Sequence, residues 1–125
     1  MQPRVILVHD DHDFVGSAIV AFRRAGLSVT AFSSPIDAWD HLKTSERVNV
    51  LITRYSFGPG QLTGAALARL AHSGRPMVRA LFMNRPSPTR AYVDDWDALD
   101  GMGEFLPESV GADDLPVAAV RSFQP

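Results

Sequence analysis

The sequence predicts an α/β fold, a doubly wound five-stranded parallel sheet with helices on both faces. Three observations lead to this prediction. Strand-like and helix-like patterns alternate five times, the first strand-like run is apolar throughout, and 125 residues with 46% hydrophobic content can bury one core. Such alternation implies right-handed crossovers and therefore parallel strands covered on both faces. We expect one domain over residues 1–125, with the strand order 2-1-3-4-5.

The first two repeats supply a central strand and an edge strand. Val5–Val8 contains only apolar residues, as expected of a strand buried on both faces. A helix is predicted to follow, with Asp13 as its N-cap and Gly26 at its end, because its apolar residues recur at helical spacing. Leu27–Phe32 alternates between apolar and polar residues, which is typical of an edge strand. A Ser-Pro pair then begins a helix over Ile36–Leu42.

The other three repeats follow from the same patterns. The expected elements are a buried strand Val48–Thr53, a loop Tyr55–Leu62, a helix Thr63–Ala71, a strand Val78–Met83, a weak helix Thr89–Leu99, a short edge strand Glu104–Leu106 and a last helix from Asp114 to Phe123. Within the loop, Gly58-Pro59-Gly60 is interpreted as a turn. It lacks the lysine and the glycine spacing of a phosphate-binding loop.

Composition excludes several classes of function. The net charge of -2 argues against general attraction to nucleic acid or to a membrane surface. The absence of cysteine excludes disulfides, thiolate metal sites and cysteine catalysis. No segment approaches the roughly 20 apolar residues of a membrane helix, and no signal peptide is recognisable. We therefore expect a cytoplasmic protein.

The charges are unevenly distributed along the chain. No acidic residue lies between Glu46 and Asp94, whereas seven of the eleven arginines fall in that interval. Two interpretations stay open. The basic middle and the acidic ends pair across the folded surface, or some arginines together form a local anion site.

Polar residues follow the predicted central strands. In a doubly wound sheet, ligands bind beyond the carboxyl ends of the strands. Those positions hold Asp10 and Asp11 after the first strand, Arg54 after the third, Asn84 after the fourth and Glu108 after the fifth.

The chain resembles the receiver domain of two-component response regulators, which has the flavodoxin- and CheY-like (βα)5 fold. The resemblance spans essentially the whole chain and rests on Leu7-Val8-His9-Asp10-Asp11, on Pro59 and Gly64 in the following loop, and on Phe105-Leu106 ahead of position 108. In that family an acidic pair binds Mg²⁺, the third strand ends in an aspartate that accepts a phosphoryl group, and a Thr or Ser and a Lys contact that group.

Carried over by position, the resemblance implies a degenerate phosphorylation pocket. Only the acidic pair remains, because the acceptor position is Arg54, the Thr/Ser position is Asn84 and the Lys position is Glu108. The position of the family's switch aromatic falls on Phe105. Glu108 and Arg54 either exchange the acid and base of the family's pair or changed independently.

Arg54 cannot accept a phosphoryl group as an aspartate does, and it stays protonated at physiological pH. Its guanidinium would stand where Mg²⁺ sits and would neutralise the acidic pair. The sequence therefore predicts an ion pair of Arg54 with Asp10, Asp11 or Glu108, no metal or other cofactor, and loss of Mg²⁺ binding.

Two further sites are candidates in the sequence. Asp11-His12-Asp13 matches the opening motif of haloacid-dehalogenase-type phosphatases, but the motif is short and common. Histidines are candidate bases or metal ligands, and His9 and His12 stand beside the acidic pair. Histidines at strand ends are more often plain surface residues.

We expect an atypical receiver, or pseudo-receiver, that acts in phosphorelay signalling as a binding module and not as an enzyme. Its partner would be a kinase, a phosphotransfer protein, an output protein or a second copy of the chain. The last helix is apolar around much of its circumference, so its side chains are the expected partner face: Leu115, Val117, Val120 and Phe123. The alternative is a phosphoryl-handling or metal-binding phosphorelay member that uses Asp10, Asp11 or a nearby histidine.

Overall fold

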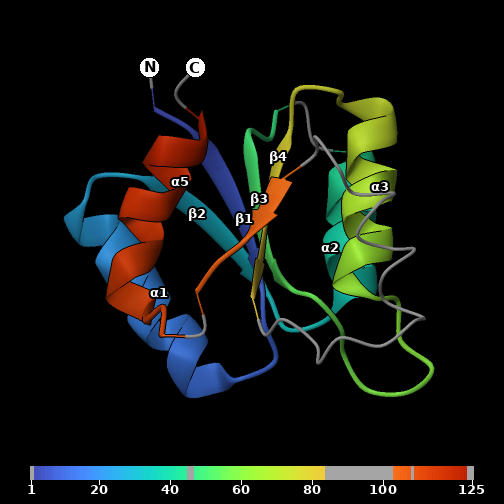
Figure 1. Cartoon of the computed structure of the whole chain (residues 1–125), viewed down its shortest axis with the longest axis horizontal. Coiled ribbons are helices and arrows are strands. Elements are labelled where there is room, and N and C mark those ends of the chain that lie inside the picture. Colours follow the sequence, from blue (N-terminus) through green and yellow to red (C-terminus); the bar gives the residue numbers. More distant parts are fainter. Residues whose placement is uncertain (1, 45–46, 84–102, 108, 124–125) are drawn as a thin grey trace.

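The computed structural model describes residues 2–44, 47–83, 103–107 and 109–123. They form a five-stranded, all-parallel sheet in the order β2-β1-β3-β4-β5 (Figure 1). The strands are β1 (Arg4–Val8), β2 (Ser28–Phe32), β3 (Val50–Arg54), β4 (Arg79–Met83) and β5 (Gly103–Phe105). The helices are α1 (His12–Arg24), α2 (Pro35–Thr44), α3 (Gly64–Gly74) and α5 (Leu115–Phe123), with a 3-10 turn η1 (Ala112–Asp114) before α5. The predicted strand order and both predicted edge strands are confirmed.

Two layers of helices enclose the sheet. Figure 1 shows α1 and α5 on one face and α2 and α3 on the other. Successive residues of β1 divide between the two layers: Val5 and Leu7 pack in the cluster that contains α1 and α5, and Ile6 and Val8 pack in the cluster that contains α2 and α3. Because neighbouring strand residues point to opposite faces, a strand covered on both sides must be apolar throughout.

The beginning of α1 corrects one prediction. The N-cap is Asp11, not Asp13, because the Asp11 carboxylate accepts hydrogen bonds from the N–H groups of Asp13 and Phe14 at 3.0 and 3.1 Å. Asp13 instead lies in the first turn, where its charge favours the helix dipole. Gly26 adopts φ of 72° directly after the helix, as the predicted glycine end requires.

The loop after β3 begins at Tyr55, as predicted. Although it lies in the loop, Tyr55 is fully buried, and its N–H donates to the carbonyl of Met83 at 2.8 Å. The turn around Gly60 that follows is exposed and has φ of 81°. Helix α3 begins after Thr63, whose hydroxyl accepts from the N–H of Ala66.

The last helix corrects a second prediction. Leu115, expected on an exposed partner face, is completely buried against the sheet, because it begins α5 on the side that faces α1 and β4. Val120 and Phe123 are half-buried against the same cluster, and only Val117 of the four is exposed. The predicted helix Thr89–Leu99 lies outside the described residues. Among the described helices, none is long and apolar enough to span a membrane.

Candidate functional site

Strand pairing brings the acidic pair and Arg54 together. β1 and β3 are direct neighbours, with Val8 opposite Thr53, so the residues that follow Val8 and Thr53 meet at one edge of the sheet. Asp10 lies just beyond the end of β1, and Arg54 is the last residue of β3. Asn84 and Glu108, predicted at the same edge, lie outside the described residues.

Arg54 and Asp10 form an ion pair. Nη1 of Arg54 donates to Oδ1 of Asp10 at 2.7 Å, the short distance typical of a charge-assisted hydrogen bond. The side chains are 30% and 43% exposed, so the pair is partly shielded from water. The hydrogen bond from Arg54 holds the pKa of Asp10 below its ordinary value, which keeps the carboxylate ionised. The ion pair predicted for Arg54 is therefore confirmed, with Asp10 as the partner.

The backbone of Arg54 is tightly held. A Cβ on Gly64 would lie only 1.7 Å from the carbonyl oxygen of Arg54, so α3 can approach β3 this closely only with glycine at position 64. The N–H of Gly64 donates to the carbonyl of Tyr55 at 2.8 Å, and the hydroxyl of Thr53 donates to the carbonyl of Arg54 at 3.0 Å. These contacts fix the point from which the guanidinium reaches Asp10.

Asp11 has a different task from Asp10. Its carboxylate caps α1, so the two members of the acidic pair are directed to different partners, one to the helix and one to Arg54. No shared carboxylate cluster is formed by this pair. Among the residues that the structure describes, no group of three His, Asp or Glu side chains could hold a metal ion.

His9 is buried, contrary to the expectation of a surface residue. It is 8% exposed, its ring stacks on Phe14 at 4.5 Å between centroids, and its Nδ1 accepts the N–H of Asp11 at 3.0 Å. Burial first, and then the charge of Arg54, lower the pKa of His9. The imidazole is therefore neutral near pH 7, and its Nδ1 hydrogen bond supports the end of β1. His12 lies exposed, and His41 contacts Phe32 on the other face.

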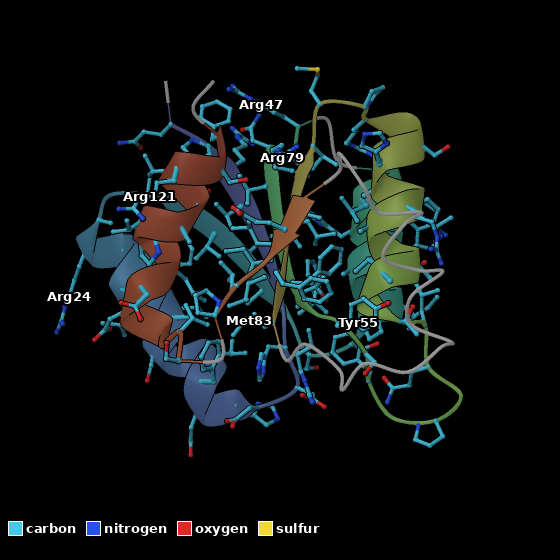
Figure 2. All side chains as sticks on the ribbon, in the orientation of Figure 1. Arg24, Arg47, Tyr55, Arg79, Met83 and Arg121 are labelled. Carbon is cyan, nitrogen blue, oxygen red and sulfur yellow. The ribbon has the colours of Figure 1, made fainter. Side chains whose placement is uncertain are left out.

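Phe105 belongs to an aromatic group that sequence reasoning did not foresee. Its ring lies 5.3 Å from Tyr55 and 5.5 Å from Phe82, and those two rings are 5.9 Å apart. Figure 2 shows Tyr55 on the α2 and α3 side of the sheet. The aromatic group links the residue next to Arg54 with the edge strand β5.

A shallow hollow of about 450 Å³ lies between β5 and α5. Phe105, Leu106, Val110 and Val117 contribute apolar surface to it, and Arg121 lies at the same hollow. Val117 is 56% exposed, the largest exposed fraction among the four residues predicted for the partner face. Of the four residues predicted for the partner face, only Val117 lines this hollow.

No protein-family model and no curated protein matches the sequence at a significant level. Solved structures do match. The Vibrio cholerae chemotaxis protein CheY4 superposes with a TM-score of 0.77 at 14% identity, over 98% of this chain and 99% of that one. A response regulator receiver domain protein from Clostridium thermocellum has a TM-score of 0.74 at 18% identity, over 97% and 94% of the two chains. An uncharacterised protein from Neptuniibacter caesariensis has a TM-score of 0.78 at 21% identity, over 98% and 87%.

The strand order, the parallel pairing and these superpositions agree with the fold expected from the sequence. The chain has the CheY-like fold of response regulator receiver domains.

Proposed function

We propose that the chain is a pseudo-receiver: a signalling module of two-component type that is not phosphorylated at the usual position and acts through protein contacts. One observation carries the proposal. The position that the receiver resemblance assigns to the phosphoacceptor is Arg54, and its guanidinium is bonded to Asp10 at 2.7 Å. An arginine offers no carboxylate for an acylphosphate.

The same ion pair argues against Mg²⁺ at this edge. Mg²⁺ prefers several carboxylate and water oxygens in octahedral geometry. Here one carboxylate of the pair is neutralised by Arg54 and the other caps α1. A divalent cation would have to displace the guanidinium and would then stand beside a fixed positive charge. We infer that Arg54 takes the electrostatic place of the metal.

The partner in this proposal docks on β5 and α5. The exposed Val117 and the apolar lining of the adjacent hollow offer a surface for a kinase, a phosphotransfer or output protein, or a second copy of the chain. Arg121 and Glu104 at the hollow supply a polar rim. We expect the module to act in the cytoplasm and without a catalytic step of its own.

The test is incubation with acetyl phosphate and Mg²⁺ followed by intact-mass measurement. The unmodified chain is expected to show no phosphoryl adduct and no saturable Mg²⁺ binding at about millimolar concentration. Arg54→Asp restores a carboxylate beside Asp10 and should gain Mg²⁺ binding, followed by NMR shifts at Asp10 and Asp11.

Arg54→Gln is the matched control, since it removes the positive charge without adding a carboxylate. It should gain much less Mg²⁺ affinity than Arg54→Asp. A stable phosphoryl adduct on the unmodified chain would reject the proposal and favour the alternative in which Asp10, Asp11 or a histidine handles the phosphoryl group.

A further inference from the structure

Basic side chains gather at the amino ends of the strands, which form the edge of the sheet opposite to Arg54. Arg4 and Arg79 begin β1 and β4, and both bond through their main chains to Asn49, which precedes β3. Arg121 lies in the last turn of α5. Figure 2 shows Arg47 and Arg79 together at this end, whereas Met83 marks the other end of β4. The basic edge is thus separated from the Arg54–Asp10 pair by the length of a strand.

A second hollow, of about 510 Å³, opens at this basic edge. Asn49 and Arg79 line it from the strands, Arg121, Ser122 and Phe123 line it from α5, and Glu104 lines it from β5. Arg79 faces α5 because it lies opposite Val50 and two residues before Leu81, both of which belong to the cluster on that face. The volume of the hollow is in the range of small-molecule sites, which extends from about 300 to 1,000 Å³.

We propose that this hollow is a binding site for a small organic oxyanion, a phosphate ester or a polycarboxylate. The described lining residues include two guanidinium groups and one carboxylate, so the described part of the lining carries a net positive charge. Planar guanidinium groups match the oxygens of phosphates and carboxylates and bind them in a forked geometry. Arg121 is exposed and can turn toward a ligand. Arg79 also interacts with other groups of the chain, and its charge acts on the hollow in addition.

Ser122 gives an independent indication. Its hydroxyl oxygen is buried and has no hydrogen-bond partner, although the residue lines the hollow. A buried hydroxyl without a partner is costly, and one rotation about χ1 changes its direction. An oxyanion in the hollow would supply an acceptor for it. Phe123 and the highly exposed Met77, which also lines the hollow, offer apolar contact to the carbon skeleton of such a ligand.

The dipole of α5, which is negative at the carboxyl end of the helix, explains the position of only one of the two arginines at the hollow. A basic residue in the last turn of a helix, such as Arg121, is favoured by the helix dipole. Arg79 begins a strand, however, so it is not one of the basic residues that favour the last turn of a helix. The hollow and the buried hydroxyl of Ser122 are likewise unrelated to the dipole.

The test is an NMR titration of the full chain with inorganic phosphate and, separately, with citrate. Saturable shifts at the amides of Arg79, Ser122 and Phe123 are expected with at least one probe, and the tighter probe identifies the chemical source of the oxyanion. Arg121→Ala should weaken that binding by about fivefold or more. Arg121→Lys keeps the charge but loses the forked guanidinium geometry, so its affinity should lie between that of the unmodified chain and that of Arg121→Ala.

Arg24→Ala is the matched control, because it removes the same charge from the end of α1, which does not line the hollow and which Figure 2 shows apart from Arg79. Its affinity should stay within about twofold of the unmodified chain, as expected for a screened distant charge. Absence of saturation with both probes would overturn the proposal. Equal weakening by Arg121→Ala and Arg24→Ala would overturn it too, since that result indicates diffuse attraction without a site.

Discussion

Asp10→Asn is the substitution that isolates the charge in the Arg54–Asp10 pair. Asparagine keeps the shape of the side chain and one oxygen that can accept from Nη1 of Arg54, and it removes the negative charge. Fully exposed ion pairs contribute about 0.2–1 kcal/mol to stability, whereas hydrogen bonds to charged groups in shielded positions contribute about 1.5–3 kcal/mol. With side chains 30% and 43% exposed, the pair lies between these cases.

We therefore expect Asp10→Asn to lower the free energy of unfolding by about 1 kcal/mol at pH 7. For a domain of this size, that loss corresponds to a decrease in Tm of about 3–5 °C. Urea denaturation and thermal unfolding followed by circular dichroism measure both quantities. The difference should shrink at high salt, because the pair is partly exposed.

The dependence on pH gives a second check. The pKa of Asp10 is lower in the folded chain than the ordinary value of 3.8, owing first to the hydrogen bond from Arg54. The pair therefore stabilises the fold fully at pH values well above 3.8, and this contribution is lost as the pH falls through the lowered pKa. The stability difference between the unmodified chain and Asp10→Asn should be constant from pH 7 to about pH 5 and should vanish in strong acid.

Asp13→Asn is the matched control at the same edge of the sheet. It removes an exposed charge from the first turn of α1 and should cost only a few tenths of a kcal/mol, the usual effect of a helix dipole. If Asp10→Asn is as stable as the unmodified chain at pH 7, or no more destabilising than Asp13→Asn, the reasoning about the ion pair is refuted.

Three other predictions concern different parts of the molecule. Because the pKa of His9 is lowered in the folded chain, the unfolded chain takes up a proton first as the pH falls through about 6.5, and stability should decrease from pH 7 toward pH 5. His9→Gln should remove that decrease in urea unfolding. Gly64→Ala should destabilise the fold by about 2 kcal/mol or more through overpacking, whereas Gly74→Ala has open space around the new Cβ and should be tolerated. Equal Tm values for the two variants would contradict the prediction. Val117→Glu should weaken self-association or partner binding in analytical ultracentrifugation without loss of fold, whereas Val20→Glu at an exposed position of α1 should leave association unchanged. A chain that is monomeric and binds no partner would contradict the role proposed for this surface.

Much of the fold follows from local patterns. The apolar run in β1 indicated a strand covered on both faces, and the alternation in β2 indicated an edge strand. Once β1 and β3 are known to be parallel neighbours, Asp10 and Arg54 must lie together at the carboxyl ends of the two strands. The ion pair was thus predictable, because it depends on topology and on complementary charge and not on fine packing.

Local patterns were insufficient wherever two choices satisfied the same rule. Asp11 and Asp13 are both acceptable N-caps, and the choice depends on where the chain leaves β1, with His9 Nδ1 holding the N–H of Asp11. Tyr55 does begin the loop after β3, but local patterns did not show that it is buried, because its ring packs against Phe82 and Phe105 on other strands. Such contacts join segments that are far apart in the sequence.

The sequence by itself determined the parallel sheet, its strand order and the presence of Arg54 at the end of the third strand, since these depend on residue type and periodicity along the chain. Only the tertiary structure decided which apolar side chains of α5 turn inward. Leu115 is buried and Val117 exposed, because the rotation of the helix about its axis is set by packing against α1 and the sheet. The tertiary structure also brought Arg79 and Arg121 to one hollow, since the distance between residues on different elements depends on how those elements pack.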